Sequence, residues 1–275
     1  RLAMSQIETQ QEVTEFLKWN PQVYADQHGQ VENYFFPPTA MSVNANVRER
    51  YNKWTDVLGR ATAKAFDANG FGYYVKDIFD FYAPVYLDSW ATFSGAIGMT
   101  QETNTSWLAT TDADGTVWTL RDGMERHFTS ALAVIESSSK NREGLLRAFA
   151  EYKHKGASGQ AAGGRKFFVA RASEQHQAER LKNILAVSHI QSEVVEGKGK
   201  FTGESLWTGK SEQVSDQGFF LVIPMAQPQA TLALSLLQTE SEFEPEFIKE
   251  QIRRRELQKA DSEYAESSEF YDLTG

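Results

Sequence analysis

Apolar residues recur every three or four positions in several segments of the chain, which is the spacing of an amphipathic helix. The clearest case is residues 44–68, which Asn69 and Gly70 close. Its recurring apolar positions are Val47, Tyr51, Trp54, Leu58, Ala61 and Ala65. Similar spacing predicts further helices over residues 5–20, 174–188, 230–237 and 240–268. Two more are predicted between them, one that begins at about residue 122 and one that ends at about residue 152. In the helix from about residue 122, the pattern places Phe128, Ala131, Leu132 and Ile135 toward the core.

Other segments have the alternation or the short apolar runs of β-strands. They are residues 23–28, 72–76, 96–102, 166–170, 193–195 and 219–223. A hairpin is predicted between residues 107–111 and 116–120, with its turn at Asp114-Gly115. Residues 79–90 are aromatic and contain Pro84, which favours a loop. The mixture of helices and strands predicts an α/β protein.

Glycine, alanine and serine dominate residues 155–164, which predicts a linker between two parts. The part after it has strand, helix and strand in the spacing of a small βαβ-type module. We therefore predict three regions, over residues 1–155, 165–240 and 241–275. The last region is a charged helical segment.

Composition excludes several classes of function. The chain has 275 residues and no cysteine, so any metal site must be built from His and carboxylate ligands. Its net charge of −9 argues against a nucleic-acid-binding surface. The longest apolar run, residues 219–226, is far shorter than the roughly 20 residues of a transmembrane helix.

Three polar residues at strand ends are candidates for chemistry. His28 ends the predicted strand 23–28, and Asp26 points to the same side of it, where a carboxylate could orient a metal-bound imidazole. Glu102 ends the predicted strand 96–102, and the other residues on its face of that strand are all small. Glu102 therefore suits the wall of a cleft and the role of a general base. The alternatives stay open: Asp26 as a simple hydrogen-bond acceptor, and Glu102 as a solvent-exposed strand end.

The order of several segments resembles the zinc carboxypeptidases, the carboxypeptidase A-like metallopeptidases. These segments are His28-Gly29, an aromatic loop, a long helix, Tyr82, Tyr86, Asp88-Ser89-Trp90 and the run from Gly95 to Glu102. The resemblance covers about residues 1–155 and is nearest to a large bacterial branch with an additional α/β module. It implies the C-terminal part of a mixed-sheet α/β/α domain.

The resemblance also implies roles for individual residues. His28 matches the zinc ligand that stands late in the family's chain, and Glu102 matches the general base. Tyr82, or alternatively Tyr86, matches the tyrosine that caps the substrate. Asp88 matches a position that sets side-chain preference. The implied reaction is hydrolysis of a C-terminal peptide or amide bond in a peptide or peptidoglycan-type substrate, and a periplasmic or secreted location is favoured.

The family's His-x-x-Glu zinc pair and its carboxylate-binding Asn-Arg segment should precede His28, but the 27 residues before His28 contain neither. The sequence therefore predicts an internal fragment that lacks most of its zinc site and is inactive alone. The only His-x-x-Glu, at His176 and Glu179, falls on a charged helix of the small module and is interpreted as coincidental. His127, His154 and His189 are interpreted as surface or helix-end residues. The alternative function is a non-catalytic α/β binding module with a degenerate cleft.

Overall fold

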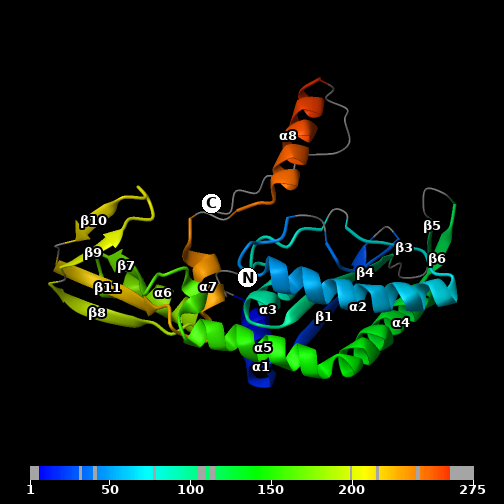
Figure 1. The fold of residues 1–275 in the computed structure, drawn as a ribbon, viewed down its shortest axis with the longest axis horizontal. Helices are drawn as coiled ribbons and strands as arrows, with labels where there is room; N and C mark the ends of the chain where they lie inside the picture. Colours follow the sequence, from blue (N-terminus) through cyan, green and yellow to red (C-terminus); the bar gives the residue numbers. More distant parts are fainter. Residues whose placement is uncertain are drawn as a thin grey trace.

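The fold is described from a computed structural model. It describes residues 6–30, 33–39, 42–76, 79–104, 109–111, 115–198, 200–214, 217–239 and 242–260. Figure 1 shows an elongated molecule, with a larger α/β part at one end, a small sheet at the other and helix α8 projecting to one side. The α/β class predicted from the sequence is confirmed.

The larger part is built on a four-stranded mixed sheet in the order β1-β4-β2-β3. Its strands are β1 (Val23–Gln30), β4 (Ile97–Asn104), β2 (Tyr34–Phe35) and β3 (Tyr73–Tyr74). β1 and β4 are parallel over eight residue pairs, from Val23 opposite Ile97 to Gln30 opposite Asn104. β2 is antiparallel to β4 and parallel to β3. Because β1 and β4 are parallel neighbours, their carboxyl ends lie side by side at the same end of the sheet.

Helices cover both faces of this sheet. Ile97 and Met99 of β4 pack with Trp54 and Leu58 of α2 (Arg48–Asn69) and with Val134 of α4 (Leu120–Lys140). On the other face lie α1 (Ile7–Trp19) and α3 (Leu87–Phe93). There the ring of Tyr24 contacts Phe16, which in turn contacts Trp90. The predicted alternation along residues 96–102 is therefore confirmed.

The prediction for α4 is wrong about which side faces inward. Phe128, Leu132 and Ile135 are exposed, with 66%, 45% and 62% of their surface accessible. The buried side of α4 instead carries small residues, namely Gly123, Ser130, Ala133, Val134 and Ser137. Small residues allow the helix to lie close to the sheet and to α2, and the larger apolar side chains are left outside.

The segment predicted as a linker is ordered structure. α5 (Arg142–Ala157) continues into it, and a short 3-10 helix, η1 (Gln160–Ala162), follows. Gly156 is buried because the backbone of Gln227 and Pro228 lies against it, with 2.8 Å from a Cβ built there to the Gln227 oxygen. The Trp90 indole also donates a hydrogen bond to Ser188 Oγ at 3.2 Å. Residues on both sides of the predicted linker thus share one hydrophobic cluster.

The small sheet has the order β7-β11-β8. Its strands are β7 (Phe167–Ala172), β8 (Glu193–Lys198) and β11 (Gln217–Pro224). Helix α6 (Gln175–Val187) connects β7 to β8, and both strands are antiparallel to β11, so β7 and β8 run parallel on either side of it. The two parallel strands of the predicted βαβ unit, β7 and β8, are therefore not adjacent, because β11 lies between them. The sequence did not predict the exposed hairpin of β9 (Phe201–Glu204) and β10 (Ser211–Val214).

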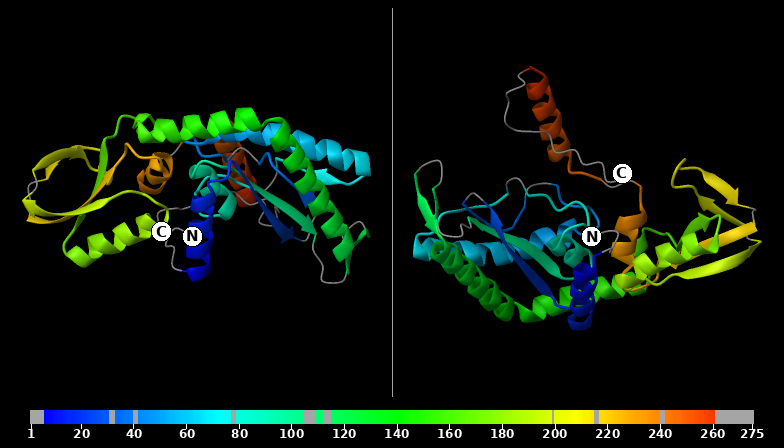
Figure 2. Two further views of the ribbon diagram at one scale, coloured as in Figure 1. Left: turned by 90° about the horizontal axis from the view of Figure 1, so that it is seen from below. Right: turned by 180° about the vertical axis from the view of Figure 1, so that it is seen from behind.

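The helix α7 (Ala230–Leu237) has the predicted bounds, and α8 (Pro245–Ala260) lies within the predicted charged helix. The right view of Figure 2 shows α8 projecting away from both sheets. The strands β5 (Ala109–Thr111) and β6 (Val117–Thr119) form the predicted hairpin, but three residues of its turn, including Asp114, lie outside the described residues. No helix among the described residues is both long and apolar enough to cross a membrane.

One buried lysine gives a prediction for stability. Lys153 of α5 donates a hydrogen bond to Gln229 Oε1 at 2.9 Å, and burial, together with the charge of Arg50, lowers its pKa to about 8. The folded state then holds fewer protons than the unfolded state between pH 8 and 10.5, so stability rises with pH there. Urea unfolding of Lys153→Met should lack this rise, which is about 2–3 kcal/mol. The exposed Lys155→Met is the control, and identical pH profiles for wild type and Lys153→Met would refute the prediction.

Candidate metal and acid–base site

The register of β1 and β4 brings two of the predicted site residues together. His28 lies directly opposite Glu102, and Asp26 lies opposite Thr100. Residues two apart on a strand point to the same side, so Asp26, His28, Thr100 and Glu102 share the face that α3 covers. The strands are parallel, and the site lies toward their carboxyl ends, where ligands bind in open α/β sheets.

Contacts around the His28 ring define its orientation. Nε2 of His28 lies 2.9 Å from Asp26 Oδ1, and Nδ1 lies 3.6 Å from Glu102 Oε1. Because an ionised carboxylate can only accept, the short Asp26 contact assigns a proton to Nε2. In the protonated ring Nδ1 donates toward Glu102. In the neutral ring its lone pair lies on the Glu102 side, as in a histidine that a carboxylate orients for a metal.

Glu102 is a buried carboxylate with an unused oxygen. Its side chain is 9% exposed, whereas that of His28 is 49% exposed. Oε2 of Glu102 is buried and has no hydrogen-bond partner among the described residues. Burial raises the pKa of Glu102, a positive charge on His28 opposes this, and Asp26 and Asp88 raise it further. A carboxylate with a raised pKa beside a half-exposed imidazole can accept and return a proton.

Asp88 was expected in a loop, but it lies in α3 and is buried. The error arose because Pro84 and the aromatic composition masked a helix of only seven residues. The Asp88 carboxylate accepts a hydrogen bond from the Ser89 N–H at 2.6 Å. Burial raises its pKa to about 6, with hydrogen bonds from Thr100 and Ser89 opposing the shift and the charges of Asp26 and Asp80 adding to it. It therefore lies beneath the site, held within the protein.

The two candidate tyrosines differ in environment. The ring of Tyr82 is buried and stacks on Phe243, with 4.2 Å between the ring centroids. Tyr86, at the start of α3, is 58% exposed. The expected role of a tyrosine that caps the substrate therefore suits the exposed Tyr86 better than the buried Tyr82, which was the first choice.

His127 is a residue near the site that sequence reasoning missed. It was interpreted as a surface residue, but its Nε2 lies 3.0 Å from the His28 carbonyl oxygen, and its Nδ1 lies 2.9 Å from Tyr34 Oη. Burial lowers its pKa, which favours the neutral ring. The only signal of this position in the sequence was the three-residue spacing of His127 and Ser130, which places both side chains on one face of a helix.

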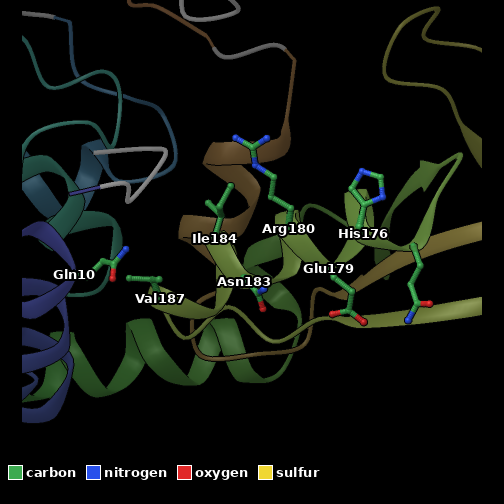
Figure 3. Close-up of a pocket in the computed structure, with 8 residues that line it drawn as sticks. Gln10, His176, Glu179, Arg180, Asn183, Ile184 and Val187 are labelled. Carbon is green, nitrogen blue, oxygen red and sulfur yellow. The ribbon is translucent and has the colours of Figure 1, made fainter. Parts of the chain in front are cut away.

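The His176–Glu179 pair lies elsewhere, in an open hollow of about 830 Å³ between α1 and α6. Figure 3 shows the His176 ring and the Glu179 carboxylate pointing in opposite directions. The ring instead lies 3.4 Å from Glu174, and both of these side chains are at least 70% exposed. This agrees with the interpretation that the motif is coincidental.

The part of the chain that the structure describes contains no group of three or more His, Asp or Glu side chains arranged to hold a metal ion. The site thus offers one imidazole nitrogen, one carboxylate that orients it and one buried carboxylate beside it. Comparison of the chain with protein-family models, curated proteins and solved structures found no match.

Proposed function

We propose that this chain carries part of the active site of a zinc carboxypeptidase-like enzyme, which hydrolyses a C-terminal peptide or amide bond. The observation that supports it most is the convergence of His28 and Glu102 at the ends of adjacent parallel strands. These two side chains are 74 positions apart in the sequence, and their contact across the paired strands is what supports the proposal. The 3.6 Å contact is slightly shorter than the roughly 4–7 Å expected across a metal and a water.

The residues present fit one side of a zinc site. Nδ1 of His28 would be a zinc ligand, and Asp26 would hold its ring through Nε2. The other ligands would come from outside the described residues, in polypeptide that precedes this segment. The chemistry that zinc supplies in such a site is a coordinated water with a pKa near 7 and a polarised carbonyl group.

Glu102 would perform the proton transfers. Its carboxylate would take a proton from the attacking water and deliver it to the leaving amine. Burial raises the pKa of Glu102, which makes its carboxylate a stronger base for the first step. Tyr86 is the exposed tyrosine that could close over a substrate. Asp88, which the resemblance gave a role in side-chain preference, is buried beneath the site and does not reach a substrate.

The second candidate function is a non-catalytic α/β binding module with a degenerate cleft. The observation that favours it is the absence of a group of three metal ligands among the described residues. In that case His28, Asp26 and Glu102 would be a structural ion-pair network that needs no metal.

Zinc content and hydrolysis distinguish the two functions. On this chain, atomic absorption should find zinc well below one ion per chain after dialysis, and hydrolysis of N-acyl dipeptides should be slow. The residual zinc-dependent hydrolysis should disappear in Glu102→Gln and persist in Glu179→Gln. Tight one-to-one zinc that survives His28→Ala, or hydrolysis unchanged in Glu102→Gln, would contradict the proposal.

A further inference from the structure

An apolar cleft lies between α1, β1 and α3. We call it the α1–α3 cleft, and its volume is about 300 Å³. None of the described residues that line it belongs to the candidate metal and acid–base site. A volume of this size is at the lower end of the range for small-molecule sites, so the cleft suits a small ligand. Four aromatic side chains line it, namely Phe16, Trp19, Tyr24 and Trp90.

Three of these rings pack against one another. The Phe16 ring lies edge-on to Tyr24 and to Trp90, with 5.6 Å and 5.1 Å between the ring centroids. The Tyr24 hydroxyl donates a hydrogen bond to Glu12 Oε1 at 3.0 Å. The Trp90 indole N–H likewise donates to Ser188. Because these two donors are already used, Tyr24 and Trp90 offer the cleft ring surface rather than hydrogen bonds.

The fourth ring, that of Trp19, is 78% exposed, although the backbone beside it is fixed. Asn20 ends α1 in the left-handed conformation, with a φ of 46°. Its backbone N–H donates to the Phe16 carbonyl at 2.8 Å, and its side-chain amide donates to the Leu17 carbonyl at 2.7 Å. Pro21 follows and restricts the chain further. A large aromatic side chain on a fixed backbone offers binding surface at a low cost in conformational entropy.

The charge around the cleft is negative. Glu12 and Glu15 are among the described residues that line it, and none of those residues is basic. Lys18 lies 3.4 Å from Glu15, but both side chains are more than half exposed. An exposed pair of this kind contributes little free energy, so Glu15 can turn toward a charged ligand. Aromatic faces attract cations as well, and Trp does so most strongly.

We propose that the α1–α3 cleft binds a small soluble quaternary ammonium compound, with its alkylated nitrogen against the rings of Trp19 and Tyr24. Such a compound is positively charged and has no N–H group, so it needs no hydrogen-bond partner from ring surface. A Lys or Arg side chain would instead place several N–H donors against the rings. An anionic ligand would be repelled by Glu15. The inference is independent of the proposed function, because the two sites share no residue.

Choline is the probe, and its neutral analogue, in which a carbon atom replaces the charged nitrogen, is the control of the same shape. The full chain has six Trp residues, whose indole N–H signals can be followed separately by ¹⁵N NMR. We expect choline to shift the Trp19 signal until it saturates. Choline should bind about tenfold more tightly than the neutral analogue, because only choline gains the attraction of the rings and of Glu15 for a cation.

Two pairs of variants separate the contributions of the ring and of the charge. Trp19→Ala should weaken choline binding about tenfold. Its matched control is Trp207→Ala, because Trp207 is 95% exposed and lies between β9 and β10, away from the cleft. Glu15→Gln should weaken choline binding about threefold and leave binding of the neutral analogue unchanged. The exposed Glu8→Gln, on the same helix, is the control for that change.

Several results would overturn the proposal. They are equal affinity for choline and its neutral analogue, choline binding that Trp19→Ala leaves unchanged, and the lack of a saturable shift at Trp19. A chain that binds phosphatidylcholine vesicles but not free choline would overturn the assignment to a small soluble ligand.

Discussion

Gly98→Ala is expected to destabilise the larger part of the protein by about 3–5 kcal/mol. A Cβ at this position would lie 1.9 Å from the Asp88 carbonyl oxygen and 2.8 Å from Thr92 Oγ1. The first of these atoms is backbone, so α3 itself would have to move away from β4. The Gly98 N–H also donates to Thr92 Oγ1 at 2.8 Å, and that hydrogen bond would be lost.

Thermal and urea unfolding measure this effect. Gly203→Ala is the matched control, because a Cβ there meets no atom within 4 Å. The control should remain within about 1 kcal/mol of the wild type. A Gly98→Ala protein as stable as the control would show that α3 does not lie on β4 as described. The small face of β4, which was predicted to be the wall of a cleft, is thus covered by α3, the helix that carries Asp88.

Asp88→Asn is expected to change how stability depends on pH. Burial is the main cause that raises the pKa of Asp88 to about 6, from its ordinary 3.8 in the unfolded chain. Between these values the folded state binds more protons than the unfolded state, so the Asp88 contribution to stability falls as pH rises from 4 to 6. A shift of this size corresponds to about 3 kcal/mol.

Urea unfolding at pH 4 and pH 7 checks this prediction. The difference in unfolding free energy between Asp88→Asn and the wild type should move in favour of the variant by about 3 kcal/mol as pH rises to 7. Parallel pH profiles for the two proteins would refute it. Asp88 also raises the pKa of Glu102, so the same variant should lower the pKa of Glu102.

Hydrophobic spacing predicted where the helices and strands lie better than it predicted which of their sides are buried. The bounds of α7 were predicted from hydrophobic spacing, and the alternation along residues 96–102 correctly grouped Gly98, Thr100 and Glu102 on one face of β4. α3 was missed because its seven residues follow a proline-containing aromatic segment. α4 was oriented wrongly because its largest apolar residues are exposed, and spacing alone cannot tell an apolar side that faces the core from one that is exposed.

The residues of the candidate site were likewise placed correctly along the chain, but their contacts with one another were not predicted. Alternation placed Asp26 and His28 on one side of a strand, but only the parallel pairing with β4 brings Glu102 to them. That pairing joins residues 74 positions apart and leaves no trace in local spacing. The contact of His127 with the His28 carbonyl depends on the packing of α4 over β1, and the helical spacing of His127 and Ser130 does not by itself predict that packing.

The most direct test of the account is a zinc titration followed at the histidine ring nitrogens by ¹⁵N NMR. The account predicts that zinc shifts Nδ1 of His28 first, leaves Nε2 bonded to Asp26, and produces no such shift at His176. Shifts at His176 before His28, or at Nε2 of His28 with loss of the Asp26 contact, would contradict the claim that His28 and Glu102 form one side of a metal site.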